Sequence, residues 1–232
     1  MNGYVLIDKP KGWTSFDVVN KVRHLIQNSG FNRTNKKRFP VGHTGTLDPL
    51  ATGLLVILMG DYTKRAPGLT KLDKTYQVTM HLGRTSSTGD AEGVLSAGST
   101  HQPAKEEMLA VTKQFVGEIE QVPPVFSAIK IDGKRAYQLA REGKDVTMEP
   151  RKVKIYEITE VEYTYPSVRF IARVSSGTYI RSLVQDIGEV LKTGAYMTDL
   201  RRTAVGDFDI TKAISVESLS AEQLYNHAQT LD

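Results

Sequence analysis

The carboxylate of Asp48 stands in a segment whose composition suits a reactive loop. Residues 41–60 read VGHTGTLDPLATGLLVILMG, and Asp48 is the only acidic residue between Asp17 and Asp61. The glycines permit positive φ angles or the close approach of another backbone, and the proline after the aspartate fixes one φ. A carboxylate held there could act as a nucleophile or as a base. The alternative is an Asx-type turn, which Asp before Pro often forms.

Other kinds of site fit this sequence poorly. A phosphate-binding loop would need GxxxxGK[ST] or GxGxxG, and the glycine spacing around Asp48 matches neither. The chain contains no cysteine, which excludes disulfides, thiolate metal sites and a cysteine nucleophile. Its five histidines never approach the i, i+4 spacing of a helical metal site. We therefore expect a cytosolic protein that binds no metal.

Charge is distributed unevenly along the chain. The net charge is only +4, but residues 18–89 carry eleven Lys and Arg against three acidic residues. This asymmetry indicates a polyanionic partner on one face, or else a solvated basic surface without a partner. Four of these bases lie in residues 31–40, FNRTNKKRFP, which we expect to be a surface loop that contacts phosphates or an idle insertion.

Five segments together identify a family resemblance. GHTGTLDPLATGLL at residues 42–55 resembles the catalytic motif of the TruB-type pseudouridine synthases, which convert a T-loop uridine of tRNA to pseudouridine. Further family motifs are similar to DKPKGWTS at 8–15, KTYQVTMHLG at 74–83, GTYIRSL at 177–183 and AYMTDLRRTAVGDF at 195–208. The resemblance extends from residue 4 to about residue 208.

The resemblance implies roles for six residues. Asp48 would be the catalytic aspartate, Arg181 its ion-pair partner, and Tyr76 the ring that stacks on the target base. The other three would contact RNA: His43 fills the space left by flipped bases, and Tyr179 and Leu200 close the pocket. Such an enzyme needs neither a metal nor a cofactor.

Each assignment has a structural alternative. Tyr76 could be a core tyrosine with a satisfied hydroxyl, and Leu200 could be ordinary core. His43 could be a solvent-exposed turn residue, and Arg181, which opposes the dipole of the helix it begins, could pair with a neighbouring surface acid. Lys9, in the first motif, is interpreted as a solvated turn lysine.

The periodicity of apolar residues predicts the elements that position these residues. Strands are expected at 3–8 and 54–60, in the alternating run DKTYQVTMHLG, and at 152–165 and 167–175, which would pair antiparallel. Helices are expected from Ser15 to Gly30, over DYTKRAPGL with a break at Pro67, and from Pro103. A further helix is expected in SSGTYIRSLVQDIGEVLKTG, with Tyr179 and Arg181 in its first turn. A strand at 195–208 precedes a tail with one helix, for which Ser220 and Gln223 are spaced as a capping box.

These elements predict one α+β domain over residues 1–232. The family resemblance adds a mixed, mostly antiparallel sheet flanked by helices, with an RNA-clasping insertion at about 124–151. Bacterial members usually continue into a PUA-type domain, which is absent here, so the chain is either cut short or binds RNA with the catalytic domain alone. We expect a monomer that acts on the T-stem-loop of tRNA, with no membrane association and no obligatory protein partner.

Two rival functions stay open. The basic half of the chain equally suits a catalytically idle RNA-binding or chaperone module, although Asp48, Tyr76 and Arg181 argue against it. The second rival is a guide-directed relative of the archaeal and eukaryotic type, which needs partner proteins.

Overall fold

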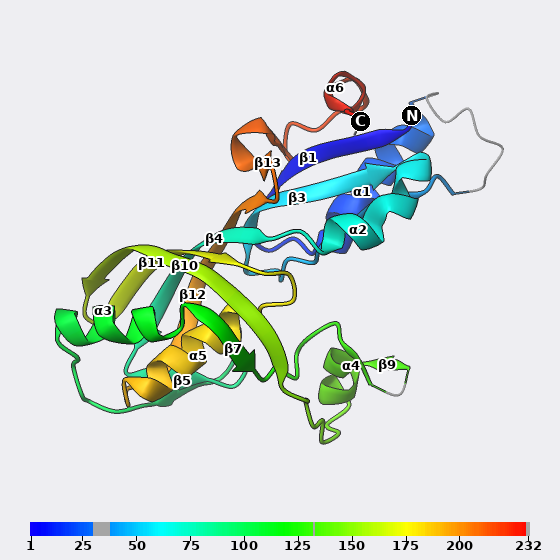
Figure 1. Cartoon of the computed structure of the whole chain (residues 1–232). Coiled ribbons are helices and arrows are strands. Elements are labelled where there is room, and N and C mark those ends of the chain that lie inside the picture. The colour runs from blue at the N-terminus through cyan, green and yellow to red at the C-terminus, as the bar shows by residue number, and fades with distance from the viewer. Residues whose placement is uncertain (30–37, 132, 231–232) are drawn as a thin grey trace. The chain divides into compact units, whose positions relative to one another are not determined.

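The computed structural model describes residues 1–29, 38–131 and 133–230, and it divides into two compact units (Figure 1). The first unit comprises Met1–Tyr76 and Leu200–Asp232, and the second comprises Gln77–Asp199. The chain therefore leaves the first unit along one strand and returns along another. The predicted mixed α+β class, with a mostly antiparallel arrangement of strands flanked by helices, is confirmed.

The first unit is built on β3, Thr52–Met59, which is buried almost throughout. It pairs antiparallel with β1 and β2, and parallel with β12. The other strands lie outside these: β14 pairs parallel with β1, and β13 pairs antiparallel with β12. The bounds of these strands are β1 Gly3–Lys9, β2 Val41–His43, β12 Ala195–Val205, β13 Phe208–Asp209 and β14 Ile214–Ser215.

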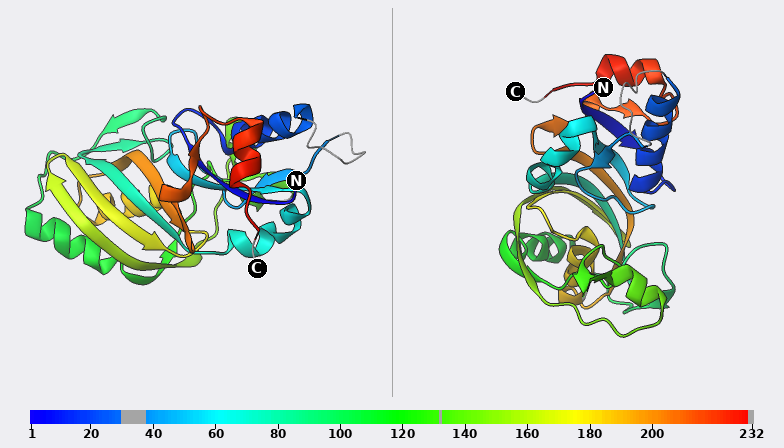
Figure 2. Two further views of the ribbon diagram at one scale, coloured as in Figure 1. Left: turned by 90° about the horizontal axis from the view of Figure 1, so that it is seen from above. Right: turned by 90° about the vertical axis from the view of Figure 1, so that its right-hand side faces the viewer.

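Both faces of this sheet are covered, which explains why β3 is an unbroken apolar run rather than an alternating one. On one face, β1 and β3 pack against α1, Ser15–Asn28, and α6, Ala221–His227. On the other face they pack against the short helices η1, Gly60–Arg65, and α2, Ala66–Thr70, together with η2, Ile210–Lys212. Figure 2 shows α1 and α6 side by side in both views, in blue and red.

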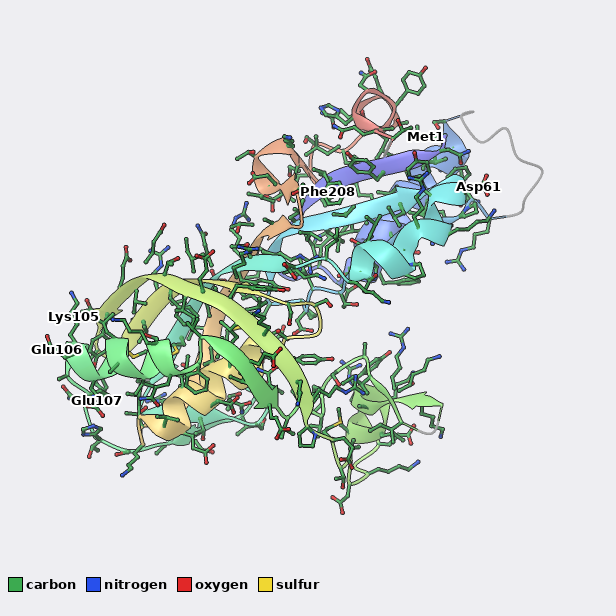
Figure 3. The ribbon with its side chains drawn as sticks, viewed as in Figure 1. Met1, Asp61, Lys105, Glu106, Glu107 and Phe208 are labelled. Atoms are coloured by element: carbon green, nitrogen blue, oxygen red, sulfur yellow. The ribbon has the colours of Figure 1, made fainter. Side chains whose placement is uncertain are left out.

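The segment after residue 208 is more than a tail with one helix. It adds β14 to the edge of β1, and Val216, Leu219 and Leu224 join the buried cluster under α1. Phe208, labelled in Figure 3, meets the ring of Tyr4 edge-on with centroids 5.1 Å apart. The polar residues of this segment concealed its apolar anchors, which are too few for a periodic pattern. Ser220 caps α6 by accepting a hydrogen bond from the backbone N–H of Gln223 at 3.1 Å. Oε1 of Gln223 has no hydrogen-bond partner among the described residues, so only this half of the predicted capping box is present.

The second unit contains antiparallel strands and the helices α3, α4 and α5. β10, Arg151–Thr164, pairs with β11, Ser167–Val174, and with β7, Gly117–Gln121, so the predicted antiparallel pair is confirmed. The helices α3, Lys105–Gln114, and α5, Ile180–Val190, contact each other, and α3 also packs on β10 (Figure 1). Two short hairpins complete the unit: β5 Arg84–Ser86 with β6 Leu95–Ala97, and β8 Lys130–Ile131 with β9 Lys134–Arg135, which leads into α4 Ala136–Arg141.

Two strands belong to both units. β4, Lys74–Leu82, has the predicted alternation, with Tyr76, Val78, Met80 and Leu82 all buried. In the first unit the Thr203 hydroxyl of β12 donates to the carbonyl of Thr75 at 3.3 Å. In the second unit Thr198 of β12 donates to the carbonyl of Thr79 at 3.2 Å. Within each unit, therefore, β4 and β12 lie next to each other.

Two proline-based predictions are wrong. Pro67 lies in the first turn of α2, which starts at Ala66, and it breaks no helix because its missing N–H is not needed there. Pro103 lies before the helix that it was expected to open, since Ala104 is extended and α3 starts at Lys105. The carbonyl of Pro103 instead accepts a hydrogen bond from the Tyr163 hydroxyl at 2.7 Å. The predicted helix end at Gly30 and most of the basic loop at 31–40 lie outside the described residues.

Gly53 is required by the packing of β12 on β3. Its φ is +99°, and a Cβ atom there would overlap the backbone carbonyl oxygen of Arg202. Gly53→Ala is therefore expected to lower the free energy of unfolding by about 2 kcal/mol or more, through backbone strain and the clash together. Urea denaturation measures this loss.

The matched control for this prediction is Gly68→Ala. Gly68 lies in α2 with open space around its Cα and no positive φ, so alanine should be neutral or should stabilise the protein by up to about 1 kcal/mol. Equal unfolding free energies for the two alanine variants would contradict the packing argument.

Candidate active site

Asp48 lies in the loop between β2 and β3, and its side chain is half-buried. Its backbone carbonyl accepts a hydrogen bond from the N–H of Ala51 at 3.1 Å, which closes a turn over residues 48–51. The turn expected from the Asp–Pro pair is thus present in the backbone. Its effect is to end the loop directly at the start of β3, a buried and rigid strand.

The segment 8–15 holds the residues on either side of Asp48. The Ser15 hydroxyl donates to the carbonyl of Leu47 at 3.1 Å and accepts from the N–H of Leu47 at 2.8 Å. The N–H of Gly12 donates to the carbonyl of Pro49 at 2.8 Å. Both chain neighbours of Asp48 are therefore anchored by hydrogen bonds to one segment.

The interpretation of Lys9 as a solvated turn lysine is wrong. Its side chain is 0% exposed, and its ammonium group donates to the carbonyls of Trp13 at 2.6 Å and Pro10 at 3.0 Å, with that of Pro49 at 3.5 Å. A buried ammonium is costly unless its donors are satisfied, and these carbonyls supply the acceptors. No sequence pattern indicates this burial, because the carbonyls come from a turn without apolar periodicity.

The paired arginines of β12 have different roles. Arg201 forms a two-pronged ion pair with Asp8, at 2.6 and 3.1 Å. Arg202 is 1% exposed, and its guanidinium donates to the carbonyls of Leu54 at 2.8 Å and Gly45 at 3.1 Å. It thereby ties together the two ends of the loop that carries Asp48. Strand alternation could have predicted that Arg202 is the buried one of the two, because it lies on the same face of the strand as the buried Leu200.

Lys74 is a further buried cation beside the same loop, next to Gly45. The ammonium group of Lys74 donates to the carbonyls of Thr70 and Leu72, the former at 2.6 Å. Burial, and to a smaller extent the Arg202 guanidinium, lower the pKa of Lys74 to about 8 against the opposing effect of Asp73. The sequence analysis assigned a role to Tyr76 of this strand but none to Lys74.

Four of the six predicted site residues lie in the first unit. His43 ends β2, opposite Ile57 of β3, and Asp48 follows in the loop. Leu200 is buried on β12, and its carbonyl lies 3.4 Å from the hydroxyl of Thr52, the first residue after the loop. Tyr76 is buried on β4, the strand that Thr203 bonds to β12. β12 is thus in contact both with the end of the Asp48 loop and with the strand of Tyr76.

The other two site residues, Tyr179 and Arg181, lie in the second unit. Tyr179 is the residue before α5, and its N–H donates to the side chain of Gln121 at 2.8 Å. Arg181 is buried in the first turn of α5, where its guanidinium donates to the carbonyls of Thr88 at 2.9 Å and Phe126 at 2.8 Å. The expectation that Arg181 pairs with Asp48, which belongs to the first unit, stays a prediction.

The sequence analysis missed Asp90, a buried acid beside Arg181. The Nε atom of Arg181 lies 3.6 Å from Oδ2 of Asp90. Asp90 also accepts hydrogen bonds at Oδ1, from the Thr88 hydroxyl at 2.5 Å and from the N–H of Glu92 at 3.1 Å. This carboxylate offsets the unfavourable position of an arginine at a helix N-terminus. Asp90 escaped notice because TSSTGDAEG has the composition of an ordinary turn.

The described residues contain no group of three or more His, Asp and Glu side chains placed to hold a metal ion. None of the helices in these parts of the chain has the length and apolar character needed to span a bilayer.

The pKa of Lys74 predicts how stability depends on pH. Below about pH 8 both the folded and the unfolded chain carry the proton, so the cost of the buried charge is fully present. Between about 8 and 10.5 the unfolded chain binds more protons, so the free energy of unfolding should rise with pH. Denaturant titrations at pH 8 and about 9 test this.

Lys74→Met should abolish this rise, because the titrating group is gone. Lys71→Met is the matched control, since Lys71 is exposed and three residues away, and it should retain the rise. If Lys74→Met kept the wild-type slope, another group would be responsible.

Comparison with known proteins gives two family matches that together cover residues 33–232. Residues 33–180 match the model of the TruB family pseudouridylate synthase N-terminal domain. Residues 181–232 match that of the tRNA pseudouridylate synthase B C-terminal domain.

Two curated relatives share the name tRNA pseudouridine synthase B. The protein from Cupriavidus metallidurans is 43% identical over 96% of this chain and 68% of its own length. That from Phocaeicola vulgatus is 46% identical over 91% of this chain and 88% of its own.

Two solved structures are also similar. The chain matches a protein in a Cbf5-Nop10-Gar1 complex with a TM-score of 0.71 and 31% identity, over 96% of this chain and 54% of that one. A second match, from an H/ACA RNP bound to a substrate RNA containing 2′-deoxyuridine, has a TM-score of 0.68 and 28% identity, over 96% and 53%. The chain thus spans about half the length of these structural relatives.

Proposed function

Because the chain belongs to the TruB family of pseudouridylate synthases, we propose that it isomerises the T-loop uridine of tRNA to pseudouridine. The observation that carries this proposal is the anchored loop of Asp48. It presents one carboxylate between two residues whose backbones are both hydrogen-bonded to the segment 8–15. Loops of this kind hold a reactive group in place and leave its side chain to the substrate.

The reaction breaks the C1′–N1 bond of uridine, turns the uracil within the site, and rejoins it through C5. The proton on C5 is then released and N1 takes up a proton, so the product has the same mass as the substrate. A carboxylate is needed at the sugar, and Asp48 supplies it either as a nucleophile at C1′ or as a base on the ribose. Neither route calls for a metal or a cofactor.

Arg181 is assigned to hold Asp48 ionised and oriented. A guanidinium offers five donors in a fixed fork, and two of its nitrogen atoms already donate to the carbonyls of Thr88 and Phe126. These bonds prevent rotation of the group, so that its charge acts from a fixed position. Phe126 lies in the insertion at 124–151, which is assigned to clasp the RNA.

The remaining site residues are assigned to contact the flipped uracil or to fill the space that it leaves in the RNA. The Tyr76 ring stacks on the uracil, and its hydroxyl assists removal of the proton from C5. Leu200 and Tyr179 close the pocket around the free base. A base inside a folded loop must be extruded before it can react, and His43 stacks in the space that it leaves.

The enzyme is proposed to act as a monomer in the cytoplasm without a protein partner. The structural match to a protein in a Cbf5-Nop10-Gar1 complex favours one alternative, in which this chain also needs partner proteins. The curated relatives named tRNA pseudouridine synthase B favour the simpler case.

The decisive measurement is tritium release from a T-stem-loop RNA labelled at uracil C5, using the purified chain alone. We expect release by the wild type and a loss of about 10²- to 10⁴-fold in rate for Asp48→Asn, since a positioned carboxylate contributes that much. Circular dichroism and RNA-binding measurements establish that the variant is folded and binds RNA.

Each outcome of this experiment separates the rival functions. Release by Asp48→Asn at the wild-type rate would remove the catalytic role of Asp48. Binding without release by the wild type would favour an RNA-binding module, and release only on addition of partner proteins would favour the guide-directed type. In the same assay, His43→Ala should weaken binding or slow base flipping and leave the chemical step intact.

A second prediction concerns Arg181. Arg181→Lys should lower the single-turnover rate by about 10- to 100-fold, because one ammonium group cannot reproduce the two carbonyl contacts and the position of the charge. Arg169→Lys is the control, since Arg169 is an exposed arginine of the same unit, 3.9 Å from Glu162. Equal rates for both variants and the wild type would show that Arg181 has no part in the reaction.

A further inference from the structure

We propose that Ser15 is a positioning residue for Asp48, acting through the backbone of Leu47. The inference rests on the proposed function, in which the Asp48 carboxylate reacts with the nucleotide. Ser15 is 2% exposed, and Leu47 is buried as well. The Ser15 hydroxyl both donates to and accepts from Leu47, and this pair of hydrogen bonds joins residues 32 positions apart.

The two hydrogen bonds of Ser15 fix two successive peptide planes. The N–H of Leu47 belongs to the peptide that joins residues 46 and 47, and its carbonyl belongs to the peptide that joins 47 and 48. Because a peptide unit is planar, fixing the Leu47 carbonyl also fixes the nitrogen and Cα of Asp48. A serine hydroxyl can do this alone, since it carries one donor and two acceptor lone pairs.

The backbone on the other side of Asp48 is fixed by different groups. Its own carbonyl is bonded to Ala51, and the carbonyl of Pro49 is bonded to Gly12. The proline ring restricts the next φ angle. Ser15 therefore supplies the constraint that precedes Asp48 in the chain, and the remaining freedom of the carboxylate lies in its side-chain torsions.

Ser15 is not used to cap the helix in which it lies. The cap of α1 is Thr14, whose hydroxyl accepts from the N–H of Asp17 at 3.1 Å, and Asp17 in return accepts from the N–H of Thr14 at 2.9 Å. Thr14 and Asp17 are exposed, whereas Ser15 is buried against the loop. The chain thus assigns helix capping and loop anchoring to adjacent hydroxyls, which makes the two roles separable by mutation.

The test compares Ser15→Ala with Thr14→Ala in single-turnover tritium release, well below the unfolding temperature of each. Ser15→Ala is expected to lower the rate about 10- to 100-fold with the Kd for RNA changed less than about twofold, because misplacement of a reacting group by about 1 Å costs that much. Thr14→Ala should lose stability by about 1 kcal/mol, as N-cap removal does, with the wild-type rate.

Ser15→Cys tests the hydrogen bonds at nearly constant volume. A thiol is a weak donor and a weak acceptor, so this variant should react at a rate between those of the wild type and Ser15→Ala. Equal rates for Ser15→Ala and the wild type would overturn the proposal. So would a loss in Thr14→Ala as large as that in Ser15→Ala, or a defect confined to Kd.

Amide hydrogen exchange gives a readout that does not depend on catalysis. Peptides covering residues 44–50 should exchange faster in Ser15→Ala than in Thr14→Ala, because the N–H of Leu47 loses its acceptor. Unchanged exchange in Ser15→Ala would overturn the proposal even if the wild type released no tritium. Absence of release with faster exchange would instead count against the proposed function and leave the anchoring role supported.

Discussion

The buried guanidinium of Arg202 is the interaction on which the geometry of the Asp48 loop depends. This group, from β12, donates hydrogen bonds to the carbonyls of both Gly45 and Leu54, and so holds the two ends of the loop at a fixed distance. The parallel pairing of β3 with β12 makes this possible, and Gly53 allows it by leaving room for the Arg202 backbone. The loop is short, but its ends are held by a strand from the other end of the chain.

Around this loop, backbone carbonyls repeatedly serve as partners for buried cations. Lys9, Lys74 and Arg202 are each buried, and each donates to carbonyls of turns or loop ends. A carbonyl satisfies a donor without neutralising it, so positive charge is retained in the interior of the first unit. Such charge favours a nearby carboxylate in its ionised form, as the proposed chemistry of Asp48 requires. The lowered pKa of Lys74 is consistent with the cost of burying its charge.

Much of the fold could be predicted from the sequence where apolar periodicity was regular. β4, β10, β11, β12 and α1 appear where the alternation or the helical spacing placed them. The prediction failed where the decisive atoms belong to the backbone. No side-chain pattern shows that Lys9 will find carbonyl acceptors, or that Pro103 will stand outside a helix. The site residues were identified by resemblance, and the anchoring roles of Ser15 and Arg202 were missed because their partners come from distant segments.

The order in which the chain is made has a consequence for the loop. Gly45 and Arg202 are separated by 157 positions, and all of the second unit is made between them. At roughly 5–20 residues per second, a nascent chain spends on the order of ten seconds or more with the Asp48 loop complete and its guanidinium anchor not yet synthesised. During that interval the segment 8–15 is already available to hold Leu47 and Pro49. The hydrogen bonds from segment 8–15 can therefore form earlier during synthesis than those from Arg202. The loop has both sets of anchors only when β12 has paired with β3.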